Sequence, residues 1–191
     1  NSDTLSWKLT PTCATAKDAE GATWYEVPEN TNSVTATASY ELSKVNVTVT
    51  LGKGTETAVE GSFDYGTQVT LGVEVGASAK TGYGTVSYTD AAENDYQSGQ
   101  TVKLTQDLAL TASAEALMYT LTFKDSDKTK VLATGNPSAY TVEDGTIELV
   151  AASGSGYEFV SWTDENGAAV SSFDTATAAN TTLYASWKKA S

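Results

Sequence analysis

Two stretches of sequence decide the fold: residues 82–90 read GYGTVSYTD, and residues 156–164 read GYEFVSWTD. They are identical at six positions and start 74 residues apart (156 minus 82). The match continues toward the N-terminus at the same spacing, where VTV at 47–49 aligns with LTF at 121–123. A fixed period of this length is typical of a repeat protein, so at least two copies of one structural unit are expected.

A partial third copy is expected at the N-terminus. LSW at 5–7 aligns with VSY at 86–88, and TASY at 37–40 aligns with YASW at 184–187. The segment between the two aligned stretches is longer here than in the later copies, with the extra residues around 13–32. This alignment divides the chain into three parts. They are a partial first repeat with an insertion at 1–44, a divergent repeat at 45–117 and a best-matching repeat at 118–191.

The segments are predicted to be strands. Residues 45–51 and 119–123 alternate apolar and polar side chains, as do residues 34–38 and 108–112. A period of two with Thr on the polar face is typical of half-buried β-strands. Turn and loop signals occur between the strands, and one short helical turn is expected. The hairpin turn is Asn166-Gly167, the polar loop is 92–100 and the helical turn lies within 171–180. The fold class is therefore mainly β with little helix.

The C-terminal copy resembles the Listeria–Bacteroides repeat, also called the internalin B-repeat family. The resemblance rests on three short patterns: YTLTF at 119–123, GYEFVSW at 156–162 and TLYASW at 182–187. One departure is Ser161, because members of that family usually place Gly before the central Trp. The resemblance implies small β-grasp-like units in tandem. It also implies a bacterial protein exported to the cell surface or wall, or otherwise extracellular, but it says little about activity.

Composition excludes several classes of function. The chain has 24 acidic and 11 basic residues, a net charge of −13, and neither Arg nor His. Without a basic patch, no nucleic-acid partner is expected. Attraction to an anionic membrane is disfavoured for the same reason, and no apolar run is long enough for membrane insertion. Histidine-based catalysis is impossible, and the single Cys13 cannot form a disulfide within the chain or a zinc site.

Paired carboxylates remain the one route to catalysis, as in glycosidases. Asp125, Asp127, Asp164 and Glu165 are candidates, but with this many acidic residues close pairs arise by chance. Small repeats also lack the deep cleft that such chemistry occupies. The same side chains offer oxygen ligands for calcium, yet neither cluster completes a calcium-binding loop, so solvated turns are favoured. We therefore expect a protein that is not an enzyme and has no metal or other cofactor.

The aromatic residues separate into two groups. Those at repeated positions are expected in the core, because each small unit needs large side chains to fill it. They are Tyr83, Tyr88, Tyr157, Trp162, Tyr184 and Trp187, with Trp7 if the partial repeat is real. The aromatic residues without a counterpart in the other copies are candidates for ligand binding. They are Trp24, Tyr25, Tyr96 and Tyr140.

Exposed aromatic rings suit sugar recognition, since a flat ring stacks on the apolar face of a pyranose. The favoured hypothesis is thus a non-catalytic module that binds a neutral polysaccharide or surface glycan, with a starch-like glucan as one candidate. A surface of this charge would repel an anionic glycan. Two alternatives stay open: a passive stalk or spacer in a surface adhesin, and adhesion to a host protein through an exposed sheet edge.

Overall fold

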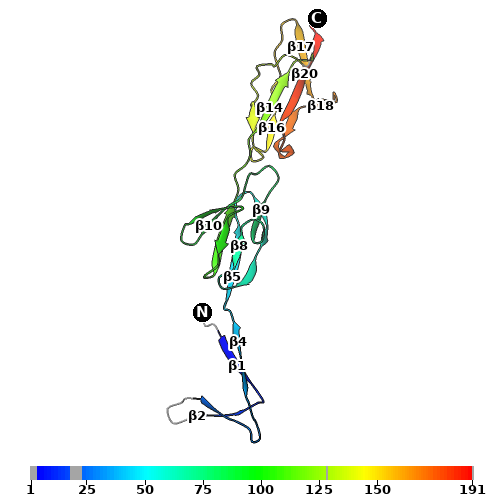
Figure 1. Cartoon of the computed structure of the whole chain (residues 1–191). Helices are drawn as coiled ribbons and strands as arrows, with labels where there is room; N and C mark the ends of the chain where they lie inside the picture. The colour runs from blue at the N-terminus through cyan, green and yellow to red at the C-terminus, as the bar shows by residue number, and fades with distance from the viewer. Residues whose placement is uncertain (1–3, 18–22, 128, 191) are drawn as a thin grey trace.

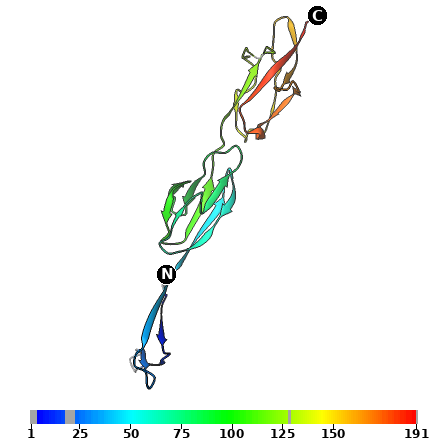
Figure 2. The same cartoon turned by 45° about the vertical axis from the view of Figure 1, so that its right-hand side comes forward.

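The computed structural model describes residues 4–17, 23–127 and 129–190, and nearly all its regular structure is β-strand. The strands form three groups that follow one another along a single long axis, in the order of the sequence (Figures 1 and 2). We call them the N-terminal ribbon (residues 4–41), the middle unit (44–113) and the C-terminal unit (119–189). In the described part of the chain, no helix has the length and apolarity needed to cross a membrane.

The N-terminal ribbon consists of two antiparallel strand pairs. β1 (Thr4–Thr10) pairs with β4 (Thr35–Glu41), and β2 (Ala14–Lys17) pairs with β3 (Thr23–Glu26). The extra residues predicted around 13–32 therefore include a hairpin that continues the ribbon away from the middle unit (Figure 1). Among the described residues, neither strand pair gains a third strand.

The middle unit is built on a five-stranded sheet in the order β11-β10-β13-β5-β7. β13 and β5 run parallel, and the other neighbours are antiparallel. The alternation predicted for residues 45–51 is confirmed, since Val45, Val47 and Val49 are all buried. The strands are β5 (Lys44–Leu51), β6 (Thr55–Val59), β7 (Gly61–Asp64), β8 (Gln68–Thr70), β9 (Gly76–Ala79), β10 (Ser87–Asp90), β11 (Asp95–Gln97), β12 (Thr101–Lys103) and β13 (Leu108–Ser113).

Two small sheets complete the middle unit, β6 with β9 and β8 with β12. Buried side chains in or directly after these strands, including Val69, Leu71 and Ala77, join one cluster with Val47 and Leu110 of the large sheet. Burial of apolar surface between the large sheet and these short strands stabilises the unit without a helix.

The C-terminal unit repeats this plan with a sheet in the order β15-β14-β20-β17-β18. β14 and β20 are parallel, like β5 and β13. A separate pair, β16 with β19, lies beside this sheet, and the predicted helical turn is a single 3₁₀ turn whose N-cap is Asp174. The elements are β14 (Tyr119–Lys124), β15 (Ala139–Tyr140), β16 (Thr146–Glu148), β17 (Tyr157–Thr163), β18 (Ala169–Val170), β19 (Ser172–Asp174), η1 (Thr175–Thr177) and β20 (Thr181–Lys189).

The prediction of a mainly β fold made of small repeat units with little helix is confirmed. In both complete units the last strand lies in the sheet centre, and the first strand lies beside it and runs parallel to it. The five residues of chain between β13 and β14 are 114–118, so one unit follows directly on the other.

Several local predictions need correction. Residues 92–100 are not simply a loop, because Asp95–Gln97 pairs with β10 and places the Tyr96 ring against the core of the middle unit. Tyr88 and Trp162 are core residues as predicted, each 1% exposed. Tyr157 is not, with 58% exposure, because it begins β17 beyond the end of the core. Trp7 is 57% exposed, since its ribbon lacks a covering layer among the described residues.

Candidate functional site

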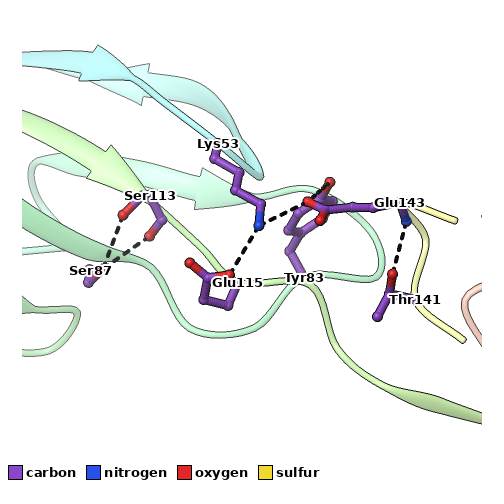
Figure 3. Close-up of polar contacts among 7 residues, drawn as sticks. All are labelled: Lys53, Tyr83, Ser87, Ser113, Glu115, Thr141 and Glu143. Atoms are coloured by element: carbon purple, nitrogen blue, oxygen red, sulfur yellow. Dashed lines mark hydrogen bonds and ion pairs between the residues drawn. The ribbon is translucent and has the colours of Figure 1, made fainter.

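The junction between the middle and C-terminal units holds a small charged cluster. Lys53, in the turn after β5, places its Nζ 3.1 Å from Glu115 Oε2 and 3.2 Å from Glu143 Oε1. The Tyr83 hydroxyl donates a hydrogen bond to the same Glu143 oxygen, at 3.1 Å. Figure 3 shows Glu143 reaching from the C-terminal unit to Lys53 and Tyr83 of the middle unit. One carboxylate therefore links two side chains across the junction.

The connector at 114–118 is bonded to the middle unit rather than free. The Ala114 amide donates to Lys53 O, at 2.9 Å, and the Leu117 amide donates to Gly82 O, at 2.8 Å. In the opposite direction, the Gly84 amide donates to Glu115 O, at 2.9 Å. These bonds hold the connector nearly up to the first residue of β14. Rotation between the units is thus confined to very few backbone angles.

Gly82 lets the two units approach closely. Its φ is +85°, a conformation that favours glycine, and a Cβ built there would lie 2.3 Å from Cγ1 of Val142 in the C-terminal unit. The glycine of the repeated Gly-Tyr pair is therefore used here as a contact between units. Its counterpart Gly156 also has a positive φ, +77°, but meets nothing within 4 Å.

The surroundings of Lys53 and Tyr83 in the cluster shift the pKa values of both side chains. The hydrogen bond to Glu115, followed by that to Glu143, raises the pKa of the Lys53 ammonium above its usual value. Partial desolvation, then the hydrogen bond to Glu143, raises the pKa of the Tyr83 hydroxyl. Lys53, Glu115 and Glu143 are nonetheless well exposed, and solvent screening makes the contribution of such ion pairs to stability small. The cluster therefore contributes more to the relative orientation of the two units than to their stability.

The C-terminal unit has a hollow of about 810 Å³ beside the second half of β20, which we call the C-terminal hollow. Its aromatic lining is Tyr157, Tyr184 and Trp187, and its polar lining includes Asp125, Ser126 and Asp164. The Trp187 indole N–H donates to Asp125 Oδ1, at 2.7 Å. This bond fixes the Trp187 ring at the wall of the hollow, and Tyr157 is the exposed part of the lining, with 58% exposure.

The four aromatic residues predicted to bind a ligand do not converge. Tyr140 is a correction: at 2% exposure it packs edge-on against Phe173, and its hydroxyl bonds to the backbone of Ala179. Its ring has no free face for a sugar, because β15 pairs with β14 and turns it into the core. Tyr96 is half-buried, and its hydroxyl donates to Asp90 Oδ2.

The other two predicted residues lie on β3 of the N-terminal ribbon. Tyr25 is 45% exposed. The backbone of Trp24 is in the same strand, but its side chain lies outside what the structure describes. The site prediction is therefore reduced to one exposed ring of known position, Tyr25, and one partly covered ring, Tyr96.

The carboxylates weighed as calcium ligands are engaged by their own turns. Asp127 Oδ1 accepts the amides of Thr129 and Lys130, and Asp164 Oδ1 accepts those of Asn166 and Ala168. Within the described ranges, no group of three or more acidic or cysteine side chains is arranged to hold a metal ion.

Sequence reasoning missed the junction and the C-terminal hollow. Nothing in the sequence marks Lys53 or Glu143 as neighbours, because their contact depends on how one unit stands on the next. Gly82 carried a usable signal, since a glycine before a repeated aromatic residue suggests close backbone packing. The residue that could have indicated the hollow is Tyr157, but its repeated position in the sequence led to the prediction that it lies in the core.

The fold and the junction define the class: a mainly β protein of small repeat units joined end to end. Residues 119–191 match the family model described as the divergent InlB B-repeat domain, and the C-terminal unit belongs to that family. Repeats of this kind are typical of bacterial surface proteins. Comparisons with curated proteins and with solved structures gave no significant match.

Proposed function

We propose that this chain is a non-catalytic spacer of an exported bacterial surface protein, which holds other parts of that protein away from the cell wall. The end-to-end arrangement of the two complete units supports this role (Figures 1 and 2). A spacer must stay extended, and the bonded connector opposes folding back of one unit on the other. The net charge of −13 adds repulsion between chain segments and keeps the surface soluble.

Small-angle X-ray scattering of the whole chain tests the spacer. The expected result is a distance distribution with a long tail, as for a rod, that changes little with salt. Salt screens exposed ion pairs, but the backbone bonds of the connector remain. A distribution of compact shape would contradict the proposal, because units that fold back cannot set a distance.

The junction offers a matched pair of variants. Glu143→Ala removes the carboxylate that spans the two units, whereas Glu115→Ala removes one that contacts Lys53 from the connector. Residual dipolar couplings report the relative orientation of the units. We expect Glu143→Ala to broaden that orientation and Glu115→Ala to leave it nearly unchanged. Equal effects of the two variants would mean that the cluster has no specific role at the junction.

Binding of a neutral glycan is the second candidate function. The C-terminal hollow supports it, because three aromatic residues line it together with Asp125, Ser126 and Asp164. Stacking on Tyr157 would be combined with hydrogen bonds to sugar hydroxyls. Tyr25, Trp24 and Tyr96 remain the alternative ligand residues from the sequence.

Native affinity electrophoresis in gels that contain starch, glycogen, β-glucan, xylan or mucin tests this second candidate. Retardation that is lost in Tyr157→Ala assigns the glycan to the hollow, and loss in Tyr25→Ala or Trp24→Ala assigns it to the N-terminal ribbon. Tyr65→Ala is the control, because Tyr65 is exposed to a similar extent but lies outside the hollow. Unchanged mobility in every gel would contradict glycan binding and leave the spacer as the proposed function.

A further inference from the structure

The middle unit carries a strand pair that has no counterpart in the C-terminal unit. By their places in the chain, β8 and β12 correspond to β16 and β19, but among the described residues no pair corresponds to β6 and β9. Figure 1 shows β9 on the side of the middle unit away from β10. The pair is therefore an addition to the sheet plan that the two units share.

A small apolar groove lies between this pair and the tight turn that follows β8. It has a volume of about 140 Å³, and none of the residues that line it is charged. Two aliphatic side chains of the lining face solvent, since Val59 is 49% exposed and Val73, in the turn, is 75% exposed. Gly72 and Gly76 bring only backbone to the lining, which leaves room beside the two valines.

The backbone has an unusual conformation at one wall of the groove. Thr57 lies at the register shift between β6 and β9, and its φ is +50°. A β-branched residue rarely adopts this left-handed conformation, because its side chain crowds the backbone there. A bulge also bends the strand and interrupts its ladder, which disfavours the addition of a further strand to β6. The surface therefore suits a partner that inserts a side chain.

Three carboxylates border the groove. Glu56 and Glu60 flank its lining residues on β6 in the sequence, and Glu74 follows Val73 in the turn. Two of them are held by backbone amides: Glu60 Oε1 accepts an amide of β5, at 2.7 Å, and Glu74 Oε2 accepts an amide of β8, at 2.6 Å. The apolar groove thus has a rim of negative charge that is partly fixed in place.

The protein does not neutralise this rim itself. In the described part of the chain, the lysine ion pairs involve Asp64, Glu115, Glu143 and Glu158, and none of them involves a rim carboxylate. The net charge of −13 attracts a basic partner from a distance as well. Charge complementarity therefore favours a partner that is basic around an apolar centre.

We propose that the groove is a docking site for a segment of another protein in which one aliphatic side chain is flanked by Lys or Arg. The aliphatic side chain fills the groove between Val59 and Val73, and the basic side chains pair with the rim. An apolar anchor inside a polar rim is a common arrangement in protein interfaces. This site adds a protein partner to the spacer and does not depend on the spacer role.

The volume of the groove distinguishes a side chain from a small molecule. Pockets that hold drug-sized ligands have volumes of about 300–1,000 Å³. The groove, with about 140 Å³, is too small for such a ligand and matches a single aliphatic side chain. The flanking charges then decide which aliphatic segments bind.

The test uses the whole chain, labelled with ¹⁵N, and a synthetic peptide Ala-Lys-Lys-Leu-Lys-Lys-Ala with blocked ends, the leucine peptide. Amide shift changes are expected at residues 57–59 and 72–78. A peptide with Ser in place of Leu should bind much more weakly, and one with Glu in place of Lys should not bind. Added salt should weaken binding of the leucine peptide, because it screens the exposed rim.

Variants of the chain separate the apolar contact from the charge. Val73→Ser should weaken binding of the leucine peptide about tenfold, whereas Val131→Ser, at a residue 63% exposed in the C-terminal unit, should have no effect. Glu60→Gln and Glu74→Gln remove charge but keep an oxygen for each backbone amide. Together they should weaken binding and reduce its dependence on salt.

Three results would overturn the proposal. The first is the absence of shift changes in the groove at millimolar leucine peptide. The second is equal binding of the serine peptide, which would mean that charge alone attracts the peptides. The third is an equal loss of binding in Val73→Ser and Val131→Ser, which would place the peptide outside the groove.

Discussion

The middle and C-terminal units build one sheet plan around two kinds of core. The buried cluster of the middle unit is mainly Val, Leu and Ala around a single fully buried ring, Tyr88. The cluster of the C-terminal unit contains four buried aromatic residues: Phe123, Tyr140, Trp162 and Phe173. Their rings meet edge to face, at 4.8 Å for Phe123 with Trp162 and 4.9 Å for Tyr140 with Phe173. The strand order therefore does not depend on an aromatic core.

The shared requirement is a large ring with a polar edge at one position. The Tyr88 hydroxyl accepts the Ala77 amide, at 3.1 Å, and donates to Ala77 O, at 3.3 Å. At the equivalent position the Trp162 indole N–H donates to Val150 O, at 2.9 Å. In both units the ring fills the core and also satisfies a backbone group of the segment that covers it.

The difference explains why the family model matches only the second unit. Phe159, Trp162 and Trp187 belong to the pattern of the repeat family, and their counterparts in the middle unit are Thr85, Tyr88 and Ala114. Gly76 packs closely against the ring that the middle unit keeps, since a Cβ there would lie 2.4 Å from the Tyr88 hydroxyl.

The largest expected effect comes from Trp162→Ala. Loss of this buried ring should destabilise the C-terminal unit by about 3–5 kcal/mol, because it leaves a cavity between Phe123 and Phe159. Denaturant unfolding followed by NMR measures the two units separately. Signals of the middle unit should persist after those of the C-terminal unit are lost. Simultaneous loss of both sets would show that the two cores unfold as one cooperative block.

A smaller effect is expected for Tyr88→Phe, which keeps the ring but leaves the buried backbone of Ala77 without its side-chain partner. Such a group costs about 1–3 kcal/mol when it is left unsatisfied. The control is Tyr96→Phe, because the Tyr96 hydroxyl bonds to the Asp90 carboxylate, which is only partly buried. Equal stability of the two variants, measured by the same denaturant titration, would show that water replaces the Tyr88 hydroxyl.

Local patterns predicted the strands well, and contacts between distant segments explain what they missed. The alternating valines of β5 and the Asn166-Gly167 turn are local patterns, in which a few neighbouring residues determine the structure. Tyr140 lies in a strand of only two residues, too short to show a period, so its burial could not be foreseen. Tyr157 occupies a repeated position, yet its exposure depends on where the covering loop ends. The contact between Lys53 and Glu143 depends on the placement of whole units.

The smallest effect concerns a turn that both units share. Asp90 Oδ1 accepts the amides of Ala92 and Asn94, just as Asp164 accepts those of its own turn. Only Asp90 also accepts bonds from the side chains of Asn94 and Tyr96. These bonds, with those from Asn94 first, lower the pKa of the Asp90 carboxyl from 3.8 to about 2.

Because this folded-state pKa is lowered, the stability that Asp90 contributes is fully present above its unfolded value and is lost as the pH falls from about 3.8 through 2. A ¹³C NMR titration of the carboxyl should therefore show a midpoint near 2. Asn94→Ala should raise that midpoint more than Tyr96→Phe does, since Asn94 provides the larger share of the bonds. A midpoint near 3.8 in the unmodified protein would mean that water competes successfully for the carboxylate, and that the turn is held by its backbone alone.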